Sequence, residues 1–282
     1  MDTTNIVAKT AIHLAKQLQA SAIVVSGNIQ LDGVFTDIPI YYAAKKPRSI
    51  IDHLISSGGE KENQAKKISD QIIQEAAGKV EHVEYAAAIE HMLEELKEGI
   101  VVGIVETKNS ASIIVNNLEE SQLVKAIREC EERVLPEVMR AVLIISLEIA
   151  ARGREGKQIG TAFIIGDVDE VMKRSHQMIL NPYAGHKDED RNLSNNQNWE
   201  SVKEFAQLDG VFVISEKGII NAAGRYLDVD AKDLNIQKGL GGRHVSAAAI
   251  TRDTVAIAVV VSESGGVVRI YKDGKKFFSL NP

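Results

Sequence analysis

The sequence has very few cysteine and aromatic residues. Its 282 residues include one cysteine, one tryptophan and five prolines, and aromatic side chains make up 5% of the chain. The single cysteine, Cys130, excludes a disulfide within the chain and a cysteine-based metal site. We expect Cys130 to pack in the core, because it lies on the apolar stripe of a helical segment. The core itself must be mostly aliphatic.

Long hydrophobic runs and excess positive charge are also absent. No window approaches the about 18 uninterrupted apolar residues of a membrane span, and the longest run, residues 141–149, contains Glu148. The N-terminus has no basic stretch followed by an apolar run, so it does not resemble a signal peptide. A net charge of −6 argues against a sequence-independent nucleic-acid binder. We expect a cytoplasmic protein with neither a membrane nor a nucleic-acid partner.

Helical and strand patterns alternate over residues 1–118, which predicts a small α/β domain. Helices are expected over residues 3–19 and 60–77, where apolar residues recur at helical spacing. Strands are expected over residues 22–27, 38–42, 99–105 and 112–115. The first of these has no polar alternation, so we expect it to be covered on both faces.

A second domain is expected over residues 119–282, and it opens with a helical region over residues 119–154. Pro136 predicts a break in that region, because proline cannot donate a helical hydrogen bond. The rest predicts a mixed sheet with helices on its faces, so the fold class is α/β in both domains. Strands are expected over residues 160–166, 210–215, 219–220, 254–261 and 266–271, helices over 168–180 and 246–250, and an exposed loop over 186–197.

A glycine-rich segment, Gly239-Leu-Gly-Gly-Arg-His244, directly precedes the expected helix at residue 246. Such a turn offers free N–H groups and the positive end of the helix dipole to an anion. Arg243 adds a bidentate phosphate donor and His244 a group that donates or shuttles a proton. The Gly-Lys-Ser/Thr ending of a Walker A loop is missing. An ordinary glycine turn before a surface helix is the alternative.

Two shorter patterns are further candidate sites. Asp209-Gly210 enters an expected strand, where a carboxylate can hold a metal or a sugar hydroxyl. Ser262-Glu263 follows the strand that ends at Val261, and binding groups in α/β sheets often lie beyond strand ends. By itself, the Asp209-Gly210 pair is a weak signal. For Ser262-Glu263, the local sequence favours a plain β-turn between two strands over a binding site.

Taken in order, these motifs resemble the diadenylate cyclase family, whose catalytic domain also forms the N-terminus of the bacterial DNA-integrity-scanning protein. The resemblance spans about residues 152–277 and rests on Gly153-Arg-Glu-Gly-Lys-Gln-Ile-Gly-Thr161, Phe163-Ile-Ile-Gly-Asp167, Asn181-Pro-Tyr-Ala-Gly-His186, Asp209-Gly210, Gly242-Arg-His244 and Ser262-Glu263. It implies condensation of two ATP molecules into cyclic di-AMP by two protomers facing each other, with Mn²⁺ or another divalent cation such as Mg²⁺.

The resemblance also implies roles for individual residues. The expected catalytic residues are Asp209, Gly210, Arg243 and His244. The expected ATP contacts are Gly210, Leu227, Gly241, Gly242, Arg243, His244, Ser262 and Glu263, with Leu227 packing on adenine. Asp209 and Glu263 are the expected metal ligands.

Two positions depart from the family pattern. Val211 stands where the family usually has alanine, and Val245 stands where it has a second arginine. The second change removes a cation from the phosphate site, for which Arg225 or Lys238 could compensate. A nucleotide sensor without turnover and an assembly protein are therefore kept as alternatives. The first 118 residues are loosely similar to the C-terminal domain of pyruvate kinase, a pairing that resembles the archaeal branch of the family.

Overall fold

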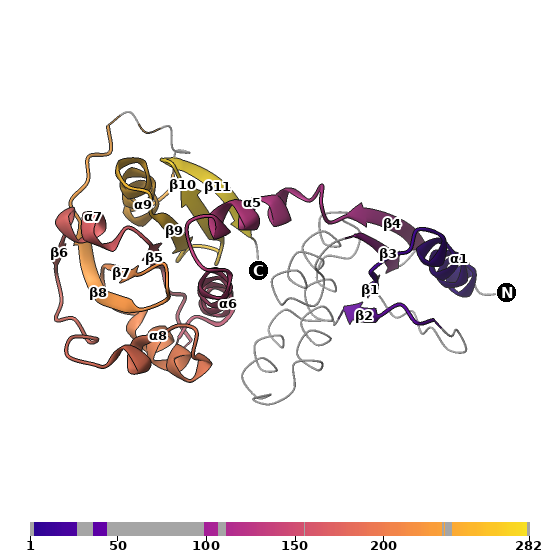
Figure 1. Cartoon of the computed structure of the whole chain (residues 1–282), viewed down its shortest axis with the longest axis horizontal. Coiled ribbons are helices and arrows are strands. Elements are labelled where there is room, and N and C mark those ends of the chain that lie inside the picture. Colours follow the sequence, from indigo (N-terminus) through magenta and orange to yellow (C-terminus); the bar gives the residue numbers. More distant parts are fainter. Residues whose placement is uncertain are drawn as a thin grey trace. The chain divides into compact units, whose positions relative to one another are not determined.

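The computed structural model describes residues 3–26, 36–43, 99–106, 111–154, 156–232, 234 and 239–280. The helix expected over residues 60–77 lies outside these ranges. The chain forms two compact units, residues 1–125 and 126–282, which are described separately (Figure 1). One helix, α5 (Gln122–Glu131), passes through this division, so the domain boundary near residue 118 stays a prediction.

The first unit contains a four-stranded sheet with the order β2-β1-β3-β4. Its elements are α1 (Thr3–Gln17), β1 (Ala22–Ser26), β2 (Ile40–Ala43), β3 (Ile100–Glu106) and β4 (Ala111–Asn117). Strand β1 pairs in parallel with β2 and β3, and β4 is antiparallel to β3. Consecutive residues Ile23 and Val24 of β1 are both fully buried, which confirms the expected strand covered on two faces.

The second unit contains a seven-stranded sheet with the order β11-β10-β9-β5-β7-β8-β6. The strands are β5 (Thr161–Ile165), β6 (Ser175–Gln177), β7 (Val211–Ile214), β8 (Ile220–Leu227), β9 (Ile257–Val261), β10 (Val268–Lys272) and β11 (Lys275–Leu280). Strands β5 and β7 are parallel, and every other neighbouring pair is antiparallel. The expected mixed sheet is therefore confirmed.

Helices cover this sheet on both sides. Helix α9 (Gly242–Asp253) and helix α6 (Pro136–Arg152) both pack on β9 and β10, with the sheet between them (Figure 1). Pro136 stands in the first turn of α6, so the predicted break between two helices is confirmed. Cys130 is buried, as expected, and its burial raises the pKa of the thiol to about 12. No helix in the described ranges is long and apolar enough to cross a membrane.

The helix expected over residues 168–180 is wrong beyond residue 173. Helix α7 (Val168–Lys173) ends at Lys173, and Ser175–Gln177 form β6, which pairs with β8. The Ser175 hydroxyl donates to the carbonyl of Val171 in the last turn of α7. This carbonyl would otherwise accept a backbone N–H if the helix continued. Pairing with a strand about 50 residues away overrides the local helical pattern here. Helix α8 (Trp199–Phe205) and strand β11 were not expected from the sequence.

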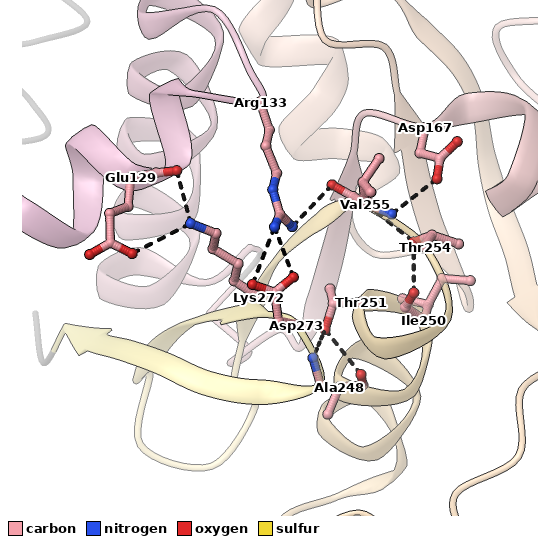
Figure 2. Close-up of polar contacts among 12 residues, drawn as sticks. Glu129, Arg133, Asp167, Ala248, Ile250, Thr251, Thr254, Val255, Lys272 and Asp273 are labelled. Atoms are coloured by element: carbon pink, nitrogen blue, oxygen red, sulfur yellow. Dashed lines mark hydrogen bonds and ion pairs between the residues drawn. The ribbon is translucent and has the colours of Figure 1, made fainter.

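Polar contacts fix the turn between β10 and β11 against the helices (Figure 2). Arg133 forms an ion pair with Asp273 at 2.9 Å and donates to the carbonyl of Val255. The Lys272 ammonium donates to the carbonyl of Glu129 at 3.1 Å, and the Gly274 N–H donates to the Thr251 hydroxyl. Strand β10 is therefore held at its turn end.

Candidate active site

A pocket of about 670 Å³ lies where three chain segments of the second unit meet. It is lined by the start of α9, by the end of β9 with the turn that follows, and by residues just before β5: Lys157, Gln158, Gly241, Gly242, Arg243, His244, Val261, Ser262, Glu263 and Ser264. Pockets of this size accommodate a small-molecule ligand. Distant segments that carry the sequence motifs thus share one cavity.

The N-terminus of α9 forms one side of this pocket. The helix begins at Gly242 rather than near residue 246, so the glycine-rich segment is its first turn. No side chain caps this end, and no acidic residue stands in the first turn. A Cβ added at Gly241 or Gly242 would meet no protein atom within 4 Å, because both face open space. Free N–H groups and the helix dipole therefore favour an anion here.

Arg243 occupies the centre of the site. Its Nη2 lies 3.5 Å from Oδ1 of Asp209 at the start of β7. A Cβ at Gly160 would come within 3.0 Å of Arg243 Nη1 and 3.1 Å of Glu263 Cβ. Glycine at position 160 thus leaves room for the guanidinium and for Glu263. The Arg243 guanidinium thus lies near both the Asp209 carboxylate and Glu263.

His244 is buried beside Arg243 and touches the core. Its Nδ1 lies 3.1 Å from the hydroxyl of Tyr271 on β10, and only 4% of its surface is exposed. Burial lowers the pKa of His244 to about 4, and the nearby charges of Arg269 and Arg243 act in the same direction. Burial also raises the pKa of Tyr271, so its hydroxyl keeps its proton. The imidazole is therefore neutral near pH 7.

The backbone around Gly210 leaves no room for a side chain. Its φ is +104°, and a Cβ there would lie 2.6 Å from the Gly224 carbonyl carbon and 2.7 Å from the backbone of Arg225. Any side chain would push β7 away from β8 at this point. Gly210 therefore fixes where Asp209 leaves the sheet, and the Asp209 side chain is 78% exposed.

Two carboxylates of the site can contribute to a metal site. Asp209 lies against Arg243, and Glu263 lines the pocket. In the described part of the chain, no group of three or more His, Cys, Asp or Glu side chains could hold a metal by itself. Two hard oxygen donors fit a cation such as Mg²⁺ or Mn²⁺, which keeps water ligands and shares the phosphates of a nucleotide.

Four residues considered from the sequence do not line this pocket: Asp209, Gly210, Leu227 and Arg225. Asp209 is connected to the pocket through its contact with Arg243. Leu227 is 5% exposed and packs in the core cluster that includes Ala247 of α9. The guanidinium of Arg225 donates to the hydroxyl of Ser175 at 2.8 Å and to the carbonyl of Met172 at 3.1 Å. It therefore points toward β6 and not toward Arg243. Lys238 lies outside the described residues.

The structure also adds residues that were not singled out from the sequence. Lys157 and Gln158 line the pocket, and Gly160 contacts Arg243. All three lie within the Gly153–Thr161 motif, so this motif could have identified them as candidate site residues. Tyr271 had no such signal, because a tyrosine on an apolar strand indicates core packing as readily as a site.

Comparison with known proteins supports the same assignment. Residues 148–276 match the family model described as DisA bacterial checkpoint controller nucleotide-binding. The chain is 40% identical over 192 residues to a diadenylate cyclase of Methanocaldococcus jannaschii, covering 64% of this chain and 59% of that one. It is 42% identical over 151 residues to a diadenylate cyclase of Haloferax volcanii, covering 53% and 55%. The chain thus spans less than two thirds of either relative.

A crystal structure of a DacA double mutant from Staphylococcus aureus is 23% identical, with a TM-score of 0.36, and the match covers 49% of this chain and 83% of that one. A likeness at this level does not bear on the assignment. Residues 6–119 match the model of the probable sensor domain DacZ_A, so the likeness to the C-terminal domain of pyruvate kinase is not confirmed. Residues 148–276 are thus similar to the nucleotide-binding domain of the diadenylate cyclases.

Proposed function

We propose that the protein is a diadenylate cyclase, which condenses two ATP molecules into cyclic di-AMP and releases two pyrophosphates. The observation that carries this proposal is the placement of Arg243. Its guanidinium lies at an uncapped helix N-terminus, 3.5 Å from the Asp209 carboxylate and beside the Ser262–Glu263 turn. A phosphate site and a carboxylate for a sugar hydroxyl are thereby adjacent.

In this proposal, the 3′-hydroxyl of one ATP attacks the α-phosphorus of another. A phosphorus–oxygen bond forms, the bond to pyrophosphate breaks, and the hydroxyl proton passes by way of Asp209 to solvent. Asp209 orients the hydroxyl by accepting its hydrogen bond. Arg243 and the first N–H groups of α9 hold the phosphates, and neutral His244 donates to them from Nε2. Positioning and charge neutralisation supply most of the catalysis in such phosphoryl transfers.

A divalent cation, Mn²⁺ or Mg²⁺, is part of the proposal, with Asp209 and Glu263 as its protein ligands. When bound, such an ion neutralises phosphate charge and lowers the pKa of a hydroxyl. The exposure of the Asp209 side chain, 78%, leaves its oxygens accessible to an ion that arrives with the nucleotide.

Ring closure requires a second protomer. One site holds one ATP, whereas the product contains two linked nucleotides and the attack occurs twice. Two protomers related by a two-fold axis can present their bound nucleotides to each other. We therefore propose a dimer or larger assembly with two sites facing each other. ATP as substrate and an unpaired, buried cysteine support a cytoplasmic location, and the net charge of −6 supports the lack of a nucleic-acid partner.

A nucleotide sensor without turnover is the second candidate. Val245 favours it, because this position of α9 carries no cation where the family has an arginine. The match of residues 6–119 to a probable sensor domain also suggests that the first unit responds to a ligand and regulates the second.

Mass spectrometry of the product tests the proposal. The purified 282-residue protein is incubated with ATP and Mn²⁺ or Mg²⁺. Asp209→Asn is tested beside the control Asp169→Asn, which changes an exposed carboxylate on α7. We expect cyclic di-AMP from the wild type and the control. Asp209→Asn should form at least a hundredfold less, which corresponds to an activation free energy that is higher by about 3 kcal/mol. Bound but unconverted ATP with both metals would instead establish the sensor.

A further inference from the structure

Strand β10 carries an arginine next to the site that no motif includes. Arg269 pairs with Val260 of β9, and Tyr271 pairs with Ala258. Side chains two residues apart point to the same face of a strand. Val260, Ala258 and Tyr271 all belong to the core cluster beneath α9. Arg269 therefore projects from the face that packs against α9.

The position of Arg269 along that face is also defined. At one side, the Val267 carbonyl accepts a hydrogen bond from Ser262 N, which anchors the Ser262–Glu263 turn. At the other side, the Tyr271 hydroxyl contacts His244. Arg269 thus lies between the turn that lines the pocket and the residue that holds His244. The positive charge of Arg269 lowers the pKa of His244 more than the charge of Arg243 does. The guanidinium of Arg269 is therefore near the imidazole.

The guanidinium of Arg269 has unused hydrogen-bonding capacity. Its Nη1 is buried and has no acceptor in the described part of the chain. Within the same residues, no Asp or Glu forms an ion pair with it. By contrast, Arg225 is held by two carbonyls and a hydroxyl. A partly buried cation without an anion is costly, and proteins ordinarily pair such a group.

We infer that Arg269 is a triphosphate ligand, supplying from β10 the second cation that α9 lacks at Val245. This inference rests on the proposed function, because it assigns a contact within the same nucleotide site. Arg243 and Arg269 then approach the phosphates from α9 and from β10, with neutral His244 between them. Arg269 does not line the pocket in the ligand-free protein, so its half-buried side chain must turn toward the pocket for Nη1 to reach a phosphate. The guanidinium then offers the planar, bidentate geometry that phosphate prefers.

The unpaired charge of Arg269 also affects the stability of the ligand-free protein. If Arg269 stabilised the fold, its removal would lower stability. An unpaired cation has the opposite consequence, because replacing it with a neutral side chain removes an uncompensated charge from a partly buried position. Arg269→Gln should therefore leave the melting temperature unchanged or raise it, while a given nucleotide concentration stabilises the variant less than the wild type.

Calorimetric titration of the full chain tests the inference, with the α,β-methylene analogue of ATP and Mg²⁺ as ligand. The analogue cannot release pyrophosphate, so binding is separated from turnover. Three variants are compared with the wild type: Arg269→Gln, Arg269→Lys and the control Lys275→Gln, which removes one positive charge from an exposed position on β11. Adenosine serves as a second probe, because it has no phosphate.

We expect Arg269→Gln to weaken binding of the analogue about tenfold or more and to leave adenosine binding unchanged. Arg269→Lys keeps the charge but not the bidentate geometry, so it should recover only part of the affinity. Lys275→Gln should retain all of it. Wild-type affinity in Arg269→Gln, an equal loss of analogue and adenosine binding, or unfolding of that variant would each overturn the assignment of Arg269. If that assignment alone is wrong, the wild type still binds the analogue and forms product. A wild type that does neither would overturn the proposed function and this inference together.

Discussion

The hydroxyl of Tyr271 lies 3.1 Å from Nδ1 of His244, and this contact joins β10 to the first turn of α9. The two residues are 27 positions apart in sequence, and both are buried. A hydroxyl that donates to Nδ1 places the ring proton on Nε2, which leaves Nε2 as the donor toward the pocket. The core thus sets the chemical form of a residue that lines the site.

Removing this hydroxyl should alter the imidazole while preserving the packing. In Tyr271→Phe we expect the proton of His244 to distribute between both ring nitrogens, and turnover to fall about tenfold with little change in the KM for ATP. Nitrogen-15 NMR of the histidine ring measures the tautomer directly. Tyr226→Phe, at a 54% exposed position of β8, is the control and should change neither quantity. An unaltered His244 spectrum in Tyr271→Phe would show that the hydroxyl does not hold the ring.

The lowered pKa of His244 makes stability depend on pH. Between pH 6.5 and about 4, the unfolded chain binds a proton at this residue and the folded chain does not. The free energy of unfolding must therefore fall as the pH decreases through this window, by on the order of 3 kcal/mol from this residue. His244→Gln lacks this contribution. Denaturant titrations should therefore show that the free energies of unfolding of wild type and variant converge or cross between pH 7 and pH 4. Parallel curves would contradict the shift.

Gly210 should tolerate alanine much less well than another glycine with positive φ. Gly185 has a φ of +80°, and a Cβ there meets nothing within 4 Å. Gly185→Ala should therefore lower the free energy of unfolding only by the cost of holding alanine at positive φ, about 1–2 kcal/mol. Gly210→Ala adds a clash with the backbone of Gly224 and Arg225, about 1–3 kcal/mol more. It should also move Asp209 and lower activity. Equal losses of unfolding free energy in the two variants would refute the close approach.

A buried ion pair joins α6 to α8. The Lys203 ammonium lies 2.7 Å from Oε2 of Glu148, and both side chains are buried. Burial raises the pKa of Glu148 even though Lys203 opposes the shift. Lys203→Met leaves an isolated carboxylate and should cost about 3–5 kcal/mol, whereas Glu148→Leu combined with Lys203→Met should cost much less.

The pH dependence of this variant gives a second check. An isolated Glu148 in Lys203→Met takes up a proton more readily when folded than when unfolded, so its deficit should shrink as the pH falls toward 4. Denaturant titration at pH 7 and pH 4.5 measures both effects. A double variant as unstable as the single one would show that the pair is not coupled.

Much of the fold could be predicted from local patterns. The strands around Ile23 and Phe163 are continuous apolar runs. Pro136 marks a helix start, because proline lacks the N–H that a position inside a helix would need. The errors arose where distant pairing decides the structure. Residues 175–177 carry a helical pattern, yet they pair with β8, because the hydrogen bonds that β8 offers replace those of a further helical turn. Strand β11 is partly exposed and polar, so its sequence carries no strand signal.

The sequence by itself determined the contiguous parts of the site. Gly241, Gly242, Arg243 and His244 are neighbours in the chain, so a glycine-rich turn and a helix N-terminus follow from local geometry. The likeness to the diadenylate cyclase family likewise follows from the order of the motifs. Only the tertiary structure placed Asp209 and Gly160 around Arg243, and Tyr271 and Arg269 beside His244. Strand register and burial decide which face a side chain occupies and what it meets there, and neither is encoded in the spacing of residues along one segment.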